Sequence, residues 1–281
     1  MSVVLALAGA VAYGLSDFVG GLASRRTSAW AVAFVATLAG GVFVLVAALL
    51  LGGEPTRTDL AWGAAAGLGN GIGTGFLYRG LAAGRMGVVA PLSGVGAALV
   101  PVAAGVVGGE RPGLLVWLGI AAALPGIWLV ASEPPPGAEA APQERLAEGV
   151  VDGILAGLGF GSLFAALGQV SASAGLYPLV MNQVVGVAVV AVLAAAVRAP
   201  WVPRGGAAWL GVLCGALALG ATAAFMLAAQ RGSLAIAGVL AALYPAFTIL
   251  LAAGVLRERI HAAQAVGLAL CGAAVTLVVL G

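Results

Sequence analysis

The sequence predicts an all-α integral membrane protein in which ten transmembrane helices form two inverted repeats of five. Composition predicts the membrane: hydrophobic residues make up 62% of the chain and charged residues only 8%, whereas a soluble domain typically carries about 25% charged residues. Ten apolar runs of helical length predict the spans. A match between the two halves of the chain predicts the repeats.

Each apolar run is close to the ~20 residues that a helix needs to cross the hydrocarbon core, whereas transmembrane β-strands need only about 9–11. No basic segment precedes the first run, so we expect a retained span and not a cleaved signal peptide. Tryptophans fall near several span ends, as an aromatic belt would place them. The spans are expected at residues 2–23, 29–51, 60–83, 86–108, 113–131, 150–171, 177–198, 206–229, 234–256 and 262–280.

Charge and cysteine content exclude several other classes. The formal net charge is only +2, which does not indicate a nucleic-acid partner. Cys214 and Cys271 both lie in apolar runs, so they suggest neither a disulfide framework nor a metal site. We expect no cofactor and no metal, and the lipid bilayer is the main partner.

The third span contains the glycine-rich stretch GAAAGLGNGIGTGFLYRG, residues 63–80. No register of it fits the G-x-G-x-x-G spacing of a dinucleotide site. On a helix, glycines spaced by four form one bare stripe, and small residues let membrane helices approach closely. The stripe is therefore expected to be a packing surface, formed by Gly63, Gly67, Gly71 and Gly75 and widened by Gly69 and Gly73.

A polar stripe of Asn70, Thr74 and Tyr78 runs beside the glycines at the same spacing of four. Two interpretations are open. The side chains could hydrogen-bond to adjacent helices, as polar groups in membrane bundles do, or they could line a water-filled substrate cavity.

The two halves of the chain align at a shift of 148 residues from the third span onward. Five spans per repeat is an odd number, so the second copy must enter from the opposite side of the membrane. Many secondary transporters have this inverted arrangement, with their site near the midplane between the repeats. The aligned positions include Gly63 with Gly211, Gly67 with Gly215, Thr74 with Thr222, and Glu110-Arg111 with Glu258-Arg259.

The organisation that follows is one repeat over residues 1–131 and a second over 150–281. Residues 132–149, SEPPPGAEAAPQERLAEG, form the only long polar connection. Their Pro, Ala and Glu content is typical of a mobile linker.

Residues 244–278 resemble the closing helices of an EamA-type repeat from the drug/metabolite transporter superfamily. The family pattern is a proline, thirteen residues to a glutamate, and then Q-x-x-G. Here these positions are Pro245, Glu258, Gln264 and Gly267. The first half matches through Glu110 and Gly119, and AYGLSDFVGGLASRR, residues 12–26, is similar to the opening of the family's first helix. Ala97 and Val116 depart from the pattern, at the positions of Pro245 and Gln264.

The resemblance implies a ten-helix carrier of small metabolites with a central cavity lined by both repeats. It also implies a multi-pass protein of the inner (plasma) membrane with both termini in the cytoplasm. It names no substrate.

Asp17 is the only acid well inside a predicted span, about 12 Å along the helix from Arg25. An ionisable group in a span costs about 2.5–3.5 kcal/mol on insertion scales and is a functional hypothesis by default. Asp17 could bind a cationic group or a coupling proton. The alternative places it near the interface, satisfied by Arg25, Arg26 or water. The second repeat has Phe164 at the matching position, so such a site would be asymmetric.

Prolines within the fourth and ninth spans free backbone carbonyls and loosen those helices, and interrupted helices in the two halves indicate a binding site. Ser93 near Pro91 and Tyr244 beside Pro245 are therefore candidates. Gln169, Asn182 and Gln183 are weaker ones. The full set of candidate substrate-binding residues is Tyr13, Asp17, Asn70, Thr74, Tyr78, Ser93, Thr222 and Tyr244.

For the remaining charged residues we prefer a structural role to a role in substrate binding. The Glu110-Arg111 and Glu258-Arg259 pairs are expected to shape turns, with each glutamate near the N-terminus of the next helix, where the macrodipole favours an anion. Arg79 could snorkel to the interface or attract an anionic substrate, and so could Arg85. His261 is expected in a solvated turn.

The leading functional hypothesis is a secondary transporter, an exporter of small metabolites, amino acids or drug-like solutes, that works by alternating access. Proton coupling through Asp17 is a further hypothesis. The alternative, a membrane-embedded enzyme acting on a lipid-linked substrate, would need acidic clusters, metal motifs or a nucleophile with a partner base. One histidine and one buried acid do not supply these, so no catalytic residues are expected. The oligomeric state is open.

Arginine placement conflicts with the orientation that the resemblance implies. The positive-inside rule would put the arginine-rich loops in the cytoplasm, opposite to both termini. We adopt the orientation of the family because some of these arginines fall at helix ends. The far-side arginines are 25, 26, 79, 85, 145, 198, 204, 257 and 259, against 57, 111 and 231 on the side of the termini.

Overall fold

The computed structural model describes residues 1–24, 26–82, 86–132, 143–202, 208–257 and 259–281. Within them every regular element is a helix. The helices are α1 (Ser2–Ser24), α2 (Ala29–Leu51), α3 (Arg57–Ala82), α4 (Met86–Val107), α5 (Leu114–Ala131), α6 (Gln143–Leu167), the short 3-10 helix η1 (Ala172–Ala174), α7 (Tyr177–Ala196), α8 (Ala208–Gln230), α9 (Leu234–Ala241), α10 (Tyr244–Val255) and α11 (Ala262–Leu280).

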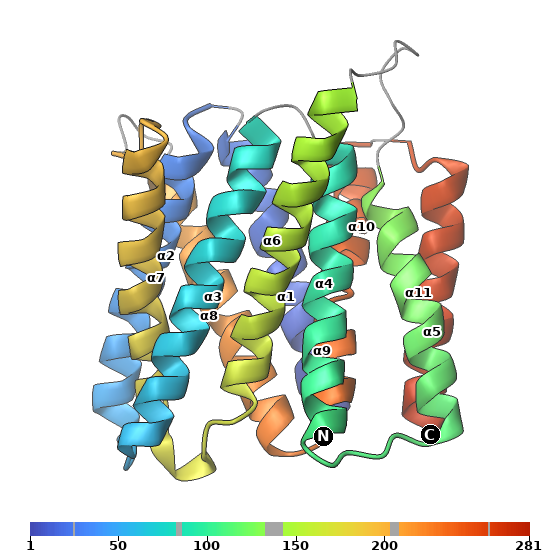
Figure 1. Ribbon diagram of the computed structural model, residues 1–281, viewed down its shortest axis with the longest axis horizontal. Coiled ribbons are helices and arrows are strands. Elements are labelled where there is room, and N and C mark those ends of the chain that lie inside the picture. The colour runs from blue at the N-terminus through green and yellow to red at the C-terminus, as the bar shows by residue number, and fades with distance from the viewer. Residues whose placement is uncertain (25, 83–85, 133–142, 203–207, 258) are drawn as a thin grey trace.

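The helices form one bundle whose two chain termini lie at the same end, the lower end in Figure 1. We refer to this as the termini end. The helix α1 starts there, whereas α6, which opens the second repeat, starts at the opposite end. The two repeats therefore run through the bundle in opposite senses. This confirms the inverted arrangement that the odd number of spans predicts.

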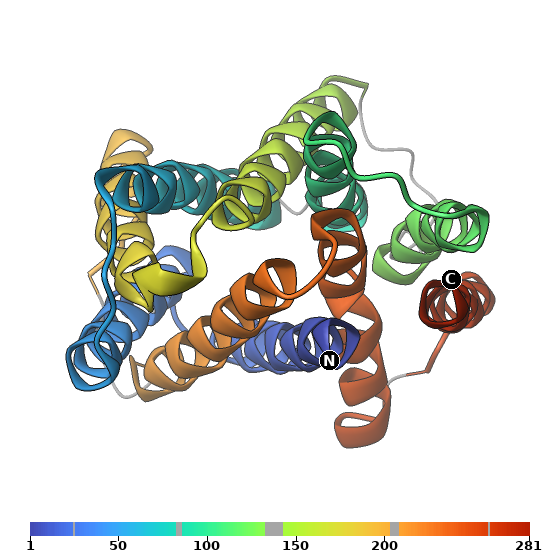
Figure 2. The same ribbon diagram turned by 90° about the horizontal axis from the view of Figure 1, so that it is seen from below.

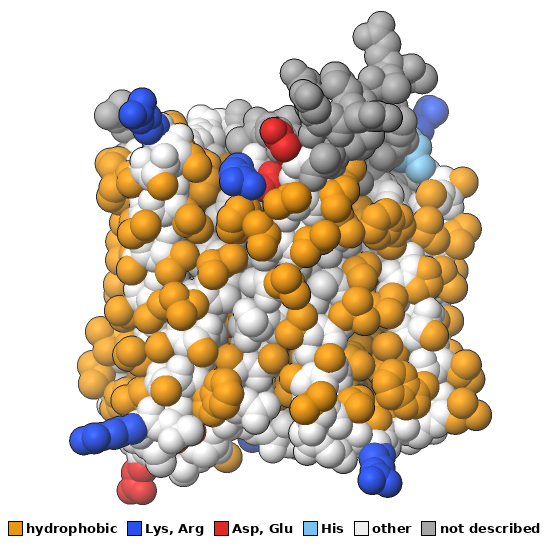
Figure 3. All heavy atoms as spheres, viewed as in Figure 1, with side chains coloured by type: hydrophobic (Ala, Val, Ile, Leu, Met, Phe, Trp, Pro, Cys, Tyr) orange, Lys and Arg blue, Asp and Glu red, His pale blue; other side chains and the backbone are white. Residues whose placement is uncertain are grey.

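Nine of the described helical segments are long and apolar enough to cross a membrane, counting Leu234–Val255 as one. The remaining predicted span, the third, corresponds to α3, which is 26 residues long. Its glycines and polar residues make it less apolar than the others. Hydrophobic side chains cover the middle of the face seen in Figure 3, and the charged side chains lie at its two ends. A bundle in lipid needs this distribution, because charge in the hydrocarbon core is costly.

The glycines of α3 pack against two helices. Gly63, Gly67, Gly71 and Gly75 face α7, whereas Gly69 and Gly73 face α6. A Cβ placed on Gly67 would lie only 2.6 Å from the backbone oxygen of Asn182, and one on Gly69 would lie 2.6 Å from that of Gly159. The predicted packing surface is confirmed, and it consists of two adjoining stripes.

The ninth predicted span is interrupted in its middle. The helix α9 ends at Ala241 and α10 begins at Tyr244, with Pro245 in its first turn. Proline has no N–H to bond to the carbonyl of Ala241, so the helical ladder stops there. The helix α4 behaves differently: it stays one helix through Pro91 and Pro101. An interrupted helix is therefore found in the second repeat, whereas α4 of the first repeat contains its prolines without an interruption.

Arg79 neither snorkels alone nor stays free to attract an anion. Its Nε donates to Oδ1 of Asp152 at 2.8 Å, and its Nη2 contacts the same oxygen. Asp152 is fully buried and lies on α6, which begins at Gln143, earlier than the predicted span. The pair joins α3 of the first repeat to α6 of the second, near the end opposite to the termini.

At the termini end, Asp59 joins the start of α3 to the loop after α6. Its carboxylate accepts from the hydroxyl of Thr56 at 2.6 Å and from the backbone N–H of Ser171 at 2.8 Å. Asp59 precedes the apolar part of α3, which begins at Leu60. These hydrogen bonds, from Thr56 first and then Ser171, stabilise the anion and lower the pKa of Asp59 to about 2.

Candidate functional site

Tyr13 lies at the midpoint of α1 and joins the two repeats through its hydroxyl. The hydroxyl lies 2.6 Å from Oγ1 of Thr222 on α8. Thr222 donates its own proton to the carbonyl of Ala218 at 2.7 Å. A threonine hydroxyl has one proton, so Tyr13 is the donor in the shared bond. Its phenolic oxygen keeps free lone pairs as acceptors.

Tyr244 forms a second pair of the same kind, with the roles of the repeats exchanged. It is the first residue of α10, at the interruption of the ninth span, and its hydroxyl lies beside Ser93 on α4. Ser93 donates its proton to the carbonyl of Ala90 at 2.9 Å. The rings of Tyr13 and Tyr244 lie 6.0 Å apart between centroids.

Two buried phenylalanines support this tyrosine pair from one side. Phe164 on α6 meets the ring of Tyr13 edge-on at 6.0 Å, and Phe225 on α8 lies 4.4 Å from Phe164. Phe164 is the counterpart of Asp17 in the second repeat, and it serves here as an apolar wall. Sequence reasoning did not assign Phe225 to the site, because one more aromatic residue in an apolar span carries no distinct signal.

Asp17 follows Tyr13 by one helical turn and faces the interior of the bundle. On one side of it, Ser16 donates to the carbonyl of Cys214 on α8 at 3.1 Å. On the other side, Gly14 packs against Tyr244 and Phe247 of α10. Asp17 therefore faces the space between α8 and α10, where its charge acts on Tyr13, Tyr244 and Cys214.

The side chain of Asp17 is nevertheless exposed to a water-sized solute. Its carboxylate makes no hydrogen bond or ion pair with any residue that the structure describes, Arg26 included. Arg25 lies outside the described residues. Asp17 lies about 10 Å before the end of α1 at Ser24. The site is therefore an acid inside the bundle that is open to solute and lacks a described cation partner.

The predicted polar stripe of α3 is only partly connected to this site. Asn70 and Thr74 are half-buried, and the amide of Asn70 lies near Gly186 on α7, close to Thr37 on α2. The side chain of Tyr78 lies outside the described part of the structure. Five of the eight predicted residues thus lie close together, namely Tyr13, Asp17, Ser93, Thr222 and Tyr244.

The weaker candidates lie elsewhere. Gln183 donates to the carbonyl of Thr37 at 3.3 Å, and Asn182 donates to the side-chain oxygen of Gln183 at 3.3 Å. Both are buried between α7 and its neighbours, where they act as hydrogen-bonding links between helices. Gln169 lies in the turn after α6, where its N–H bonds to the carbonyl of Ala166.

Glu110 closes the bundle at the termini end, below the site. It accepts from the hydroxyl of Ser233 and the N–H of Leu234, both at 2.6 Å, and from the N–H of Ala235 at 3.0 Å. It therefore caps α9 in the other repeat, where unpaired N–H groups and the macrodipole favour an anion. The backbone N–H of Glu110 bonds to the carbonyl of Gly105 at 2.9 Å, so Glu110 takes part in the predicted turn. The expectation that its carboxylate lies at the N-terminus of its own next helix, α5, is wrong. Glu258, its counterpart, lies outside the described residues.

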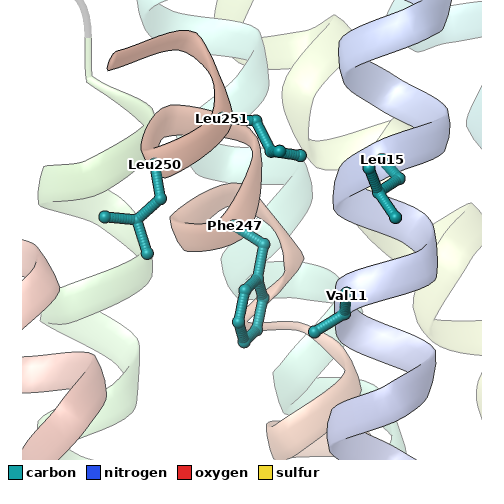
Figure 4. A pocket seen from close by; sticks show the side chains of 5 residues that line it. All are labelled: Val11, Leu15, Phe247, Leu250 and Leu251. Atoms are coloured by element: carbon teal, nitrogen blue, oxygen red, sulfur yellow. The ribbon is translucent and has the colours of Figure 1, made fainter. Parts of the chain in front are cut away.

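An apolar hollow lies between α1 and α10. It measures about 260 Å³ and is lined by Val11 and Leu15 of α1 and by Phe247, Leu250 and Leu251 of α10 (Figure 4). All five side chains are apolar. A groove of this kind on a lipid-facing surface suits an acyl chain and offers nothing to orient a polar solute.

Comparison with known proteins gives the following matches. A family model described as the EamA-like transporter family matches residues 1–132 and 147–280. No curated protein matches the chain at comparable significance. Seventeen solved chains do match. One, described only as "Crystal structure of protein", has a TM-score of 0.80 at 17% sequence identity, covering 99% of this chain and 96% of its own. At that identity the likeness concerns the fold alone.

Proposed function

Because the chain belongs to the EamA-like transporter family, within the drug/metabolite transporter superfamily, we propose that it is a secondary transporter that exports a small solute by alternating access. One observation carries the proposal: two tyrosine–hydroxyl pairs, each formed between the repeats, surround an acid without a described cation partner. Tyr13 lies at the middle of its span, where transporters with inverted repeats bind their substrates.

The contacts between the repeats support a rocking movement. Tyr13 of the first repeat bonds to Thr222 of the second, and Tyr244 of the second lies beside Ser93 of the first. A solute between them would contact both repeats in one state and lose contacts in the other. Differential binding of this kind is what lets a ligand bias two conformations.

The described conformation supports access from the end opposite to the termini. Glu110 holds the N-terminus of α9 against α4 at the termini end, and Pro101 packs on Gly238 in the same interface. In Figure 2, which looks from the termini end, α10 leans away from α4 beyond the break at Tyr244. Since Asp17 is exposed above the closed end, solute would reach it from the opposite side.

We also propose the organisation and surroundings that go with this mechanism. Residues 1–131 and 150–281 would act as the two moving repeats, with residues 132–149 as their linker. The protein would span the inner (plasma) membrane with both termini in the cytoplasm. Protons would be the coupling ion and Asp17 their site, because it is the one acid that faces the described interior space without a partner.

A binding screen followed by transport tests the proposal. The purified full-length protein is screened by thermal shift against amino acids, amines, nucleobases, sugars and neutral drug-like solutes. Each hit is then assayed for flux in proteoliposomes under a pH gradient. A ligand that binds the folded state raises the melting temperature by mass action. Stabilisation should be lost in Tyr244→Ala and kept in Phe247→Ala, a matched aromatic control in the apolar groove on the same helix.

The outcomes separate the parts of the proposal. Flux above that of protein-free liposomes supports transport. If Asp17→Asn leaves pH-driven flux unchanged, the coupling role of Asp17 is wrong. If no solute of the panel crosses, the transport function itself is contradicted.

A further inference from the structure

We propose that the solute carries a protonated amine, a primary or secondary ammonium group, that binds between Asp17, Tyr13 and Tyr244. This inference rests on the proposed transport function and narrows its substrate class. It depends on three properties of the site: its charge, the direction of its hydrogen bonds, and its aromatic faces.

The ionised form of Asp17 gives the site a negative charge. Asp17 is the acid that faces the interior, and its carboxylate has no hydrogen bond or ion pair within the described chain. Arg79 binds Asp152 on α6, and the other described arginines lie at helix ends or in loops. An anionic solute would meet an uncompensated carboxylate here, whereas a cation would supply the missing partner.

Three of the four hydroxyl groups of the site have no free proton to offer. Thr222 and Ser93 donate to backbone carbonyls of their own helices, and Tyr13 donates to Thr222. What these three groups present to a ligand is a set of lone pairs. A carboxylate is also an acceptor only.

A lining of acceptors selects a ligand that donates hydrogen bonds. A primary or secondary ammonium has two or three N–H groups, so it can bond to the carboxylate and to a tyrosine oxygen at the same time. A quaternary ammonium has the charge but no N–H group, and an alcohol has a donor but no charge. The site therefore distinguishes the three by two separate criteria.

The aromatic faces suit the same cation. The rings of Tyr13 and Tyr244 lie 6.0 Å apart at an angle of 54°, and cations bind tyrosine rings within about 6 Å of the centroid. Phe164 and Phe225 add an apolar wall behind Tyr13. An amine with a small apolar body would place its nitrogen at Asp17 and its body against this wall.

The test uses a matched series of probes on the purified full-length protein: phenethylammonium, its N,N,N-trimethyl derivative and phenethyl alcohol. Binding is measured by titration calorimetry and flux in proteoliposomes. We expect phenethylammonium to bind most tightly. Asp17→Asn should weaken phenethylammonium about 10- to 100-fold, the loss expected for a hydrogen bond to a charged group, and should leave the alcohol unchanged. Glu54→Gln, which removes a charge from an exposed loop residue, should change neither.

Tyr13→Phe separates donor recognition from charge. It keeps the ring and removes the phenolic oxygen, so phenethylammonium should lose affinity and the trimethyl derivative should not. Equal binding of the ammonium and the alcohol, or equal binding by wild type and Asp17→Asn, would overturn the inference. If anionic or neutral solutes cross the membrane and ammonium probes do not, the amine class is wrong while transport stands. If no solute crosses, both proposals fail.

Discussion

Removing the carboxylate of Glu110 is expected to release the termini end of the bundle. Three hydrogen bonds end on this group, from the Ser233 hydroxyl and from the N–H groups of Leu234 and Ala235. Each hydrogen bond to a charged group makes a net contribution to stability of about 1.5–3 kcal/mol. An anion at a helix N-terminus adds about 0.3–1 kcal/mol. Glu110 is half-buried, so water replaces part of what is lost.

We therefore expect Glu110→Gln to shift the equilibrium toward opening by about 2–3 kcal/mol, from these hydrogen-bond and dipole values. Since ~1.4 kcal/mol is tenfold, the open population rises roughly 30- to 140-fold. A cysteine at Val102, which is 6% exposed on α4 beneath the cap, reports this opening. Its rate of reaction with a membrane-impermeant maleimide follows the open population when closing is fast. Cys214 and Cys271, both buried, are first replaced by alanine.

Glu54→Gln is the matched control, because it removes an acid from an exposed loop at the same end of the bundle. It should leave labelling unchanged. If Val102→Cys is labelled at the same rate with and without Glu110→Gln, the reasoning is refuted. The cap on α9 would then not control the opening of the termini end. A lowered melting temperature without faster labelling would have the same meaning.

Further predictions concern packing, pH and orientation. Gly67→Ala should destabilise the protein by about 1–3 kcal/mol through overpacking, because its Cβ would meet the Asn182 backbone, whereas Gly220→Ala, with open space around it, should not lower the melting temperature. The lowered pKa of Asp59, about 2, lies below the ordinary value of ~3.9, so its contribution to stability is present above about pH 4 and is lost as the pH falls toward 2. Thermal melts of Asp59→Asn should therefore show a weaker acid dependence than wild type, and an unchanged profile would contradict this. In intact cells, a cysteine at the exposed Val197 should react with an impermeant reagent and one at Thr58 should not, whereas the reverse result would favour the orientation set by the arginines.

Local pattern and composition were sufficient for much of the architecture. An apolar, nearly uncharged chain has to use lipid as its solvent, and spans of ~20 residues then have to be helices, since a backbone in lipid must satisfy its own hydrogen bonds. The spacing of four between the α3 glycines follows from the helical period, so their packing role was predictable. Asp17 was identifiable because an ionisable side chain within a span is energetically costly and therefore indicates a function.

The interruption at Pro245 shows where local rules stop being sufficient. Pro91 and Pro101 obey the same chemistry, yet α4 continues through both, whereas the ninth span breaks before Pro245. A missing N–H weakens a helix by a similar amount in each case. Whether the helix then breaks depends on the neighbours that hold the two halves, and these are set by the packing of other spans.

The partners of the polar groups were decided only by the tertiary structure. Tyr13 bonds to a residue 209 positions away, Glu110 to one 123 positions away, and Arg79 to one 73 positions away. A sequence period shows which side of a helix a residue occupies, but not which helix lies opposite. The sequence by itself therefore determined the solvent, the spans, their inversion and the unusual acid. The packing of the two repeats against each other, which only the folded bundle defines, decided that this acid lies near two tyrosines and that Tyr13 already donates its hydroxyl proton to Thr222.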